Sequence, residues 1–195
     1  MNEIEIIRSQ LAAEQSHAAE VANACVAALG STAGISAPVE ATTLFREACV
    51  SYLVWVLSRF EERDQTLSEL LASRQSLDNG AAAASARHLG GLIGVTGTSR
   101  EALSRLEKAL AATDSTSARA SWQEFARFFN SAWSPRRAAL ERALAEHLGV
   151  AQWRSVCAID ADSMLEERNR YARVAERLPA GIALRHEEPR DPPRG

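Results

Sequence analysis

The sequence predicts an all-α protein, an up-down-up-down four-helix bundle with an additional C-terminal helix. Alanine and leucine supply 37 and 20 of the 195 residues, and both residues are strong helix formers. Aromatic residues make up only 6% of the chain, and runs of β-branched residues are nearly absent, which disfavours a β-sandwich or a barrel. Apolar residues recur at helical spacing through several long segments.

The first two helices are expected over residues 2–29 and 41–74, separated by a loop that contains Gly, Ser and Pro. Apolar or small residues recur every three or four positions on each helix, and Glu14 lies on the apolar face of the first. Long helices joined by a short loop should pack antiparallel. The residues on the two apolar faces are Ile7, Leu11, Ala18, Val21, Cys25 and Val26, and then Phe45, Cys49, Tyr52, Val56, Phe60, Leu67 and Leu70.

The third helical region has a less regular sequence. Residues 81–95 are rich in alanine but include three glycines, which fit either a bend or a close helix contact. Thr98 and Glu101 have the spacing of a capping box and predict a helix over 99–112. The fourth helix carries one aromatic stripe, and Pro135 is expected where this helix restarts or kinks, at the first position of a segment that runs to Leu148 and Gly149. The stripe consists of Trp122, Phe125, Phe129 and Trp133.

The C-terminal part of the chain predicts a short segment around Trp153 and a last helix. Ser163 and Glu166 have the spacing of a second capping box, and the last helix should end before Pro179. Residues 179–195 contain four of the six prolines of the chain. We therefore expect one helical domain over 1–178 and a disordered Pro/Arg-rich tail over 179–195.

Composition excludes several classes of protein. The net charge of −3 argues against a nucleic-acid partner, which would require a basic face. Apolar runs are too short for a membrane span, the N-terminus has no apolar signal core, and the three cysteines form no C-x-x-C motif, so a cytoplasmic protein with reduced thiols is expected. No catalytic motif is present, so no catalytic residue is assigned and the chain is not expected to be an enzyme.

Two histidines are candidates for metal binding. Glu14 and His17 have the Glu-x-x-His spacing that places two ligands on one face of a bundle helix, and His88 lies in the third helical region. Both histidines are also compatible with ordinary surface or capped positions. Arg63 and Asp64 fit either a mutual ion pair at the edge of the bundle, or a pair with Arg136, or the remains of a polar metal pocket.

The order of long helices with these histidines resembles the hemerythrin-like (HHE cation-binding) family, over roughly residues 5–155. That family repeats a helix pair with one histidine on the first helix and His-x-x-x-Glu or Asp on the second. Phe60 and Ala132 stand where the second histidines belong, 43 residues after His17 and 44 after His88. Asp64 matches one carboxylate position, whereas Arg136 replaces the other. The resemblance therefore implies a family fold in which most metal ligands are lost.

The expected function is binding, sensing or assembly by a non-catalytic bacterial bundle without a cofactor, with a homodimer or another protein as its partner. The alternative is a metal-binding protein that handles oxygen, nitric oxide or iron, with His17, His88, Glu14 and Asp64 as ligands. Iron is then the expected metal.

An apolar pocket is a further expectation. Phe60 and Ala132 in place of histidines would leave an apolar interior with Arg136 as a polar anchor, which suits a small anionic or apolar ligand. Aromatic residues on these helices are equally explained as core. An enzyme that clamps an anionic substrate with Arg136 would lack an identified nucleophile or base. The predicted pocket residues are Tyr52, Phe60, Phe129, Trp133 and Arg136.

Overall fold

The computed structural model describes residues 3–30, 39–75, 98–112, 115–147 and 149–184. The helices are α1 (Glu3–Gly30), α2 (Val39–Gln75), α4 (Ser115–His147), α5 (Val150–Cys157) and α6 (Ala161–Glu176), together with a helical segment over 98–111. The described residues contain no β-strand, so the all-α prediction is confirmed. None of the described helices combines the length and the apolar character that a membrane span requires.

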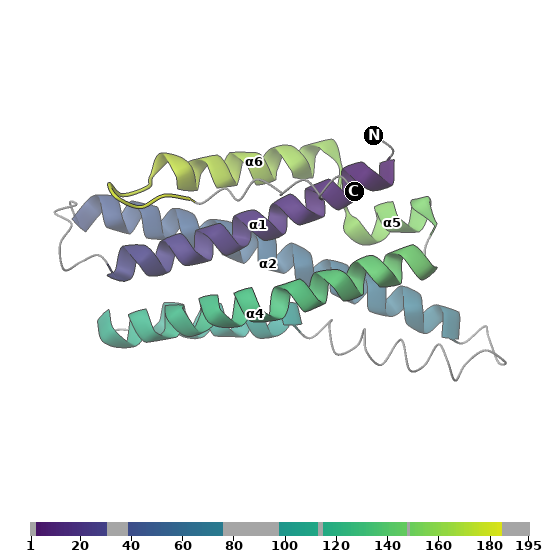
Figure 1. Ribbon diagram of the computed structural model, residues 1–195, viewed down its shortest axis with the longest axis horizontal. Coiled ribbons are helices and arrows are strands. Elements are labelled where there is room, and N and C mark those ends of the chain that lie inside the picture. The colour runs from purple at the N-terminus through teal and green to yellow at the C-terminus, as the bar shows by residue number, and fades with distance from the viewer. Residues whose placement is uncertain (1–2, 31–38, 76–97, 113–114, 148, 185–195) are drawn as a thin grey trace, which may run out of the picture.

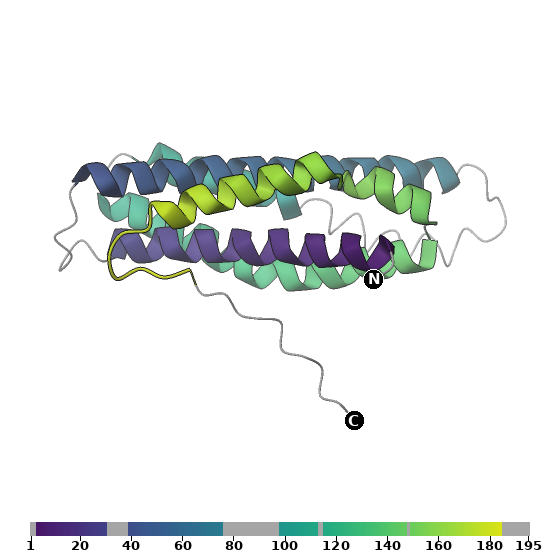
Figure 2. The ribbon, with the colours of Figure 1, turned by 90° about the horizontal axis from the view of Figure 1, so that it is seen from above.

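The long helices form a bundle. α1, α2, segment 98–111 and α4 run in alternating directions along the long axis of the molecule (Figure 1), and α1 packs against both α2 and α4. The additional C-terminal helix, α6, lies along α1 and α2, as the view from above shows (Figure 2). The short helix α5 closes one end of the bundle against α1 and α2.

The residues that the sequence places on the apolar faces are the core of the protein. The larger of two apolar clusters joins the C-terminal half of α1 to α2, segment 98–111 and α4, and includes Phe45, Tyr52 and Phe60. The smaller cluster packs Trp153 of α5 against Ile7, Leu11 and Leu67. Trp122, Phe125 and Phe129 of the aromatic stripe are at most 1% exposed, so these three residues are core.

A polar layer separates the two apolar clusters. On α1 the smaller cluster ends at Leu11 and the larger begins at Ala18, and on α2 the larger ends at Phe60 and the smaller begins at Leu67. The side chains between these bounds include buried charged residues. Burying an unpaired charge costs about several kcal/mol for each ion. These buried charges therefore need partners, and they are candidates for a special structural or functional role.

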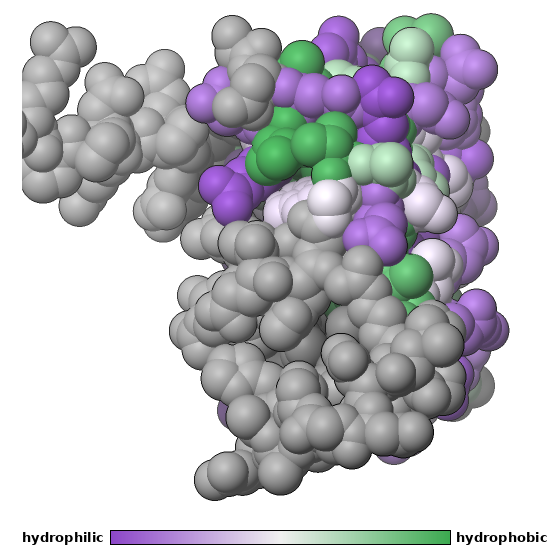
Figure 3. Space-filling view, turned by 90° about the vertical axis from the view of Figure 1, so that its right-hand side faces the viewer, coloured by the Kyte–Doolittle hydropathy of each residue, from purple (hydrophilic) through white to green (hydrophobic). Residues whose placement is uncertain are grey.

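The end of the bundle near α5 shows an apolar group of described residues bordered by hydrophilic ones (Figure 3). Ile6 and Val150, in the N-terminal part of α1 and at the start of α5, are 39% and 42% exposed. Isolated exposed apolar residues are normal on protein surfaces.

The structure corrects two local expectations about where helices begin. α4 continues through Pro135 to His147, so the helix does not restart at that proline. The cap of α6 is Asp160, whose carboxylate accepts a hydrogen bond from the Ser163 backbone N–H at 2.7 Å. Ser163 is thus the third helical residue of the capping box and not its first member, because an aspartate at the preceding cap position satisfies the free N–H groups.

The first residues of the expected tail pack against the bundle. α6 ends at Glu176, before Pro179, as expected. Residues 179–184 then turn back, and Ile182 and Leu184 pack against the larger apolar cluster. Gly181 makes this turn with φ of 84°, a conformation that favours glycine. Residues 185–195, like His88 and the 81–95 region, lie outside the described residues.

Candidate functional site

The centre of the polar layer is an ion pair between α1 and α2. Arg63 Nη1 donates to Glu14 Oε2 at 2.5 Å, and Arg63 Nη2 donates to Glu14 Oε1 at 3.2 Å. The Glu14 side chain is fully buried and that of Arg63 is 2% exposed. Two parallel N–H···O bonds from a guanidinium to a carboxylate form the strongest and most specific protein ion pair. The carboxylate that Arg63 binds is thus Glu14 of α1 and not its chain neighbour Asp64. The expected pair with Arg136 lies outside the described residues.

The same arginine ties α5 to α2. Arg63 Nε donates to the backbone oxygen of Cys157, the last residue of α5, at 2.6 Å. Arg59, one turn earlier, donates to the oxygen of Ala158 at 3.0 Å and lies 3.8 Å from Glu14. Burial and the charge of Arg63 lower the pKa of Arg59 below its usual value. Two guanidiniums therefore satisfy carbonyls at the C-terminal end of α5, where positive charge is favourable.

Asp64 faces a different neighbour. Consecutive residues of a helix point about 100° apart, because one turn takes about 3.6 residues. Asp64 accepts a hydrogen bond from the Ser99 hydroxyl at 2.7 Å, which links α2 to segment 98–111. Ser99 is fully buried and Asp64 is 2% exposed. The two adjacent charges thus hold two separate helix contacts.

His17 is bound by a residue of α6. His17 Nδ1 lies 2.8 Å from Glu167 Oε1, and Tyr52 of α2 donates its hydroxyl to the same oxygen at 2.8 Å. Because a carboxylate can only accept, His17 carries a proton on Nδ1 in this contact. Glu167 is 1% exposed and the His17 side chain is 14% exposed. One buried carboxylate therefore joins α1, α2 and α6.

Tyr171 completes this group on α6. Its ring stacks on His17, with centroids 3.9 Å apart and planes at 18°, and its hydroxyl donates to Glu20 Oε2 at 2.5 Å. Burial and the hydrogen bond to Glu20 raise the pKa of Tyr171 above its usual value. Burial, followed by the negative charge of Glu167, raises the pKa of Tyr52 well above 10.0. Both tyrosines are held in their neutral, donating form.

The described residues do not fit a metal centre. A di-iron centre in a helical bundle takes several Glu and His ligands that project into one interior site. Among the described residues, no three His, Cys, Asp or Glu side chains are grouped so that they could hold a metal ion. Glu14 is engaged by Arg63, Asp64 by Ser99 and His17 by Glu167. The positive charge of Arg63 beside Glu14 also opposes a cation.

The three cysteines are buried free thiols. Cys25 and Cys49 face each other in the larger apolar cluster, and the hydrogen bond between the two thiols, with burial, raises the pKa of Cys49. Burial raises the pKa of Cys157 to about 11. Neutral, buried thiols are poor nucleophiles and poor metal ligands.

The predicted apolar pocket is only partly described. Tyr52, Phe60 and Phe129 belong to one core cluster and are at most 1% exposed. Arg63 lies over the ring of Phe60, 5.6 Å from its centroid. The side chains of Trp133 and Arg136 lie outside the described residues. Of the three described residues, Tyr52 also borders a groove at the surface.

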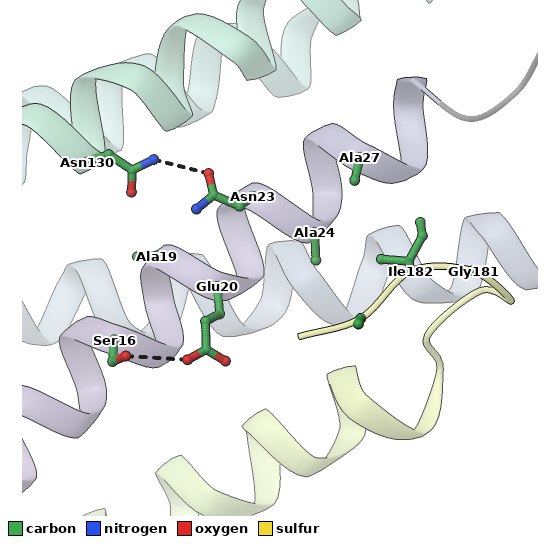
Figure 4. A pocket seen from close by; sticks show the side chains of 10 residues that line it. Ser16, Ala19, Glu20, Asn23, Ala24, Ala27, Asn130, Gly181 and Ile182 are labelled. Carbon is green, nitrogen blue, oxygen red and sulfur yellow. Dashed lines mark hydrogen bonds between the residues drawn. The ribbon is translucent and has the colours of Figure 1, made fainter. Parts of the chain in front are cut away.

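Figure 4 shows a groove on the side of α1, with a volume of about 670 Å³. The Glu20 carboxylate lies at its wall and accepts a hydrogen bond from Ser16 at 3.3 Å. Asn130 of α4 donates to Asn23 of α1 at 3.0 Å. Residues 181–183 form the opposite wall. The remaining lining residues are Ala19, Ala24 and Ala27.

A second groove runs between α2 and α6, and we name it the α2–α6 groove. Its volume is about 310 Å³, and a more open depression of about 630 Å³ continues from it over Trp55. Ser51 and Arg170 line both. The residues that line the α2–α6 groove are Glu47, Ala48, Ser51, Tyr52, Arg170, Arg173 and Arg177.

Sequence reasoning missed the partners of the predicted residues. Glu167 and Tyr171 lie 150 and more residues from His17 in the sequence, on the additional C-terminal helix. A signal was present, because Glu167, Tyr171 and Val174 recur every three or four positions and mark the face that α6 turns to the bundle. The pairing of this face with His17 has no local signal.

No protein-family model, curated protein or solved structure matches this chain. The hemerythrin-like resemblance accordingly stays a hypothesis about its origin.

Proposed function

We propose that the chain is a non-catalytic binding protein with a hemerythrin-like build that folds and works without a metal. The buried ion pair between Glu14 and Arg63 carries this proposal. In the metal-binding alternative, which has Glu14 among its ligands, this carboxylate would be available to a cation. Here a guanidinium occupies it with two hydrogen bonds, and the pair is shielded from water.

The energetics favour the ion pair over a metal. A cation at Glu14 would have to displace Arg63, which would then be a buried charge without its carboxylate. Breaking one side of a buried pair costs about 3–5 kcal/mol. Arg63 would also release the Cys157 oxygen and hence the end of α5. The layer is therefore suited to hold α1, α2 and α5 in register.

The polar side chains around Glu167 hold α6 in register with α1 and α2 in the same way. They join α1, α2 and α6 through His17, Tyr52 and Tyr171, and α6 in turn builds one wall of the α2–α6 groove. We infer that the buried polar groups are structural and that binding takes place on the surface they support. We place this activity in the cytoplasm of a bacterial cell, with a second copy, another protein or a small ligand as the partner.

Metal analysis tests this proposal against the alternative of an iron-handling protein. The full chain is purified from cells grown with added iron, and bound metals are measured together with the visible absorption spectrum. We expect substoichiometric iron, at the same level in a His17→Ala/His88→Ala double variant and in a His147→Ala control. Stoichiometric iron that disappears only in the double variant would establish the metal-binding alternative.

A further inference from the structure

The α2–α6 groove concentrates positive charge on a chain with a net charge of −3. Arg170, Arg173 and Arg177 follow each other at intervals of three and four residues, so they lie on one face of α6 and its C-terminal end. All three line the groove, and Glu47 of α2 supplies the negative charge in its lining. Glu166 pairs with Arg170, so the two remaining guanidiniums against Glu47 leave one net positive charge, which suits a monoanionic group.

The three arginines differ in how they are engaged. Arg170 is fixed, because it donates to Glu166 at 2.6 Å and to Ser51 at 3.2 Å and lies over Trp55, 5.5 Å from the ring centroid. Arg177 makes a long contact of 3.5 Å with the backbone oxygen of Leu44. Within the part of the chain that the structure describes, the exposed guanidinium of Arg173 has no hydrogen bond or ion pair.

The free donors favour an oxyanion as the ligand. Each guanidinium has five N–H donors in a planar fork, and this fork matches a carboxylate or a phosphate group. Arg173 and Arg177 have most of these donors available, whereas Arg170 holds the shape of the groove through Ser51. A volume of about 310 Å³ accommodates an anionic head group and part of a small organic body.

The apolar residues of the adjoining depression, which stand beside polar and charged lining residues such as Glu62, offer a surface for the rest of such a ligand. Trp55 and Val54 line the depression, and Val54 is 41% exposed. Arg59 and Arg170 lie over the Trp55 ring at 5.0 and 5.5 Å from its centroid. A ring or short chain attached to the anionic head would contact these residues and gain affinity from buried apolar area.

We propose that the α2–α6 groove binds a small organic oxyanion, with its carboxylate or phosphate head between Arg173 and Arg177 and its apolar body against Trp55. This assigns a ligand class to the binding role proposed above and rests on that role. It places the anionic ligand at the surface between α2 and α6 and not at Arg136, where the sequence suggested it.

The test uses the full chain and three probes in isothermal titration calorimetry: inorganic phosphate, phenyl phosphate and benzoate. Phenyl phosphate or benzoate should bind more tightly than inorganic phosphate, and the tighter of the two identifies the head group. Arg173→Gln should weaken this binding about tenfold or more, the usual effect of losing a charged hydrogen bond. Arg168→Gln, which removes an exposed α6 arginine outside the groove lining, should leave the binding unchanged.

Two further variants test the contacts of the anionic head group and of the apolar body of the ligand separately. Trp55→Leu should remove the advantage of phenyl phosphate over inorganic phosphate and leave the binding of inorganic phosphate intact. Arg177→Gln repeats the Arg173 test should that variant not fold, as judged by circular dichroism. No binding of any probe, or equal weakening by Arg173→Gln and Arg168→Gln, would overturn the groove proposal. Because metal content is measured separately, such a result would leave the metal-free binding role standing.

Discussion

Replacing Arg63 by methionine should destabilise the protein more than any exposed charge substitution. Methionine retains much of the apolar stem of arginine but removes all three hydrogen bonds, two to Glu14 and one to the Cys157 oxygen. The Glu14 side chain is fully buried, so its charge would keep only the longer contact with Arg59, at 3.8 Å. The loss from breaking such a pair is about 3–5 kcal/mol, out of a total stability of about 5–15 kcal/mol for a domain.

The assay is urea unfolding followed by circular dichroism. For a chain of this size, each kcal/mol lowers Tm by about 2–4 °C, so thermal unfolding gives a second readout. The control is Arg100→Met, which breaks an exposed pair with Glu61 at 2.8 Å and should cost about 0–1 kcal/mol. A loss below about 1 kcal/mol for Arg63→Met would refute the claim that the pair holds the bundle.

A double variant measures the interaction between Glu14 and Arg63 separately from the contribution that each side chain makes alone. Glu14→Leu/Arg63→Met replaces both charges by apolar side chains, and such replacements are often neutral or stabilising. The double variant should therefore be more stable than Arg63→Met alone, with a coupling energy of about 2–3 kcal/mol. Equal or lower stability of the double variant would mean that Arg63 acts through packing and not through Glu14.

Three other changes test further contacts. Because the pKa of Tyr52 is raised, the folded state keeps the phenol proton above pH 10, whereas the unfolded state loses it. The free energy of unfolding should therefore be unchanged below pH 10 and fall above it. Urea unfolding between pH 8 and 11 should show a shallower fall for Tyr52→Phe than for the parent protein, and identical slopes would contradict the assignment. Ser99→Ala removes the hydroxyl donor to buried Asp64 and should cost about 1–3 kcal/mol in urea unfolding, with no measurable loss as the contrary result. Ala158 follows α5 as its C-terminal cap, with a φ of 46°. Ala158→Gly should therefore raise Tm, because glycine adopts this conformation without the cost of about 1–2 kcal/mol that other residues bear; a lower Tm would contradict this reasoning.

The apolar faces of α1 and α2 were predictable because their residues repeat at helical spacing. Ile7, Leu11, Phe45 and Leu67 are buried where that spacing places them. Even the burial of Glu14 follows from its position on the apolar face. The identity of its partner does not follow, because Arg63 is 49 residues away in the sequence. The local sequence gives no information about the register in which two helices pack.

The interpretation of His17 shows a second limit. Spacing alone made it a metal ligand or a surface histidine, yet it is held between Glu167 and Tyr171 of α6. The continuous helix through Pro135 is a similar case. Proline removes one backbone hydrogen bond of a helix, and tertiary packing decides whether the helix continues. Local preferences therefore located the helices, whereas long-range contacts defined the site.

The measurement that tests the central claim most directly is thermal unfolding of the full chain with excess Fe²⁺ or Zn²⁺ and with a chelator. A metal that binds only the folded state at 100 times its Kd stabilises it by about 2.7 kcal/mol, which corresponds to a rise in Tm of about 5–11 °C for a chain of this size. We expect the same Tm in all three conditions, because Arg63, Ser99 and Glu167 already engage the candidate ligands. A rise in Tm that saturates with metal and is lost in His17→Ala would contradict a metal-free bundle.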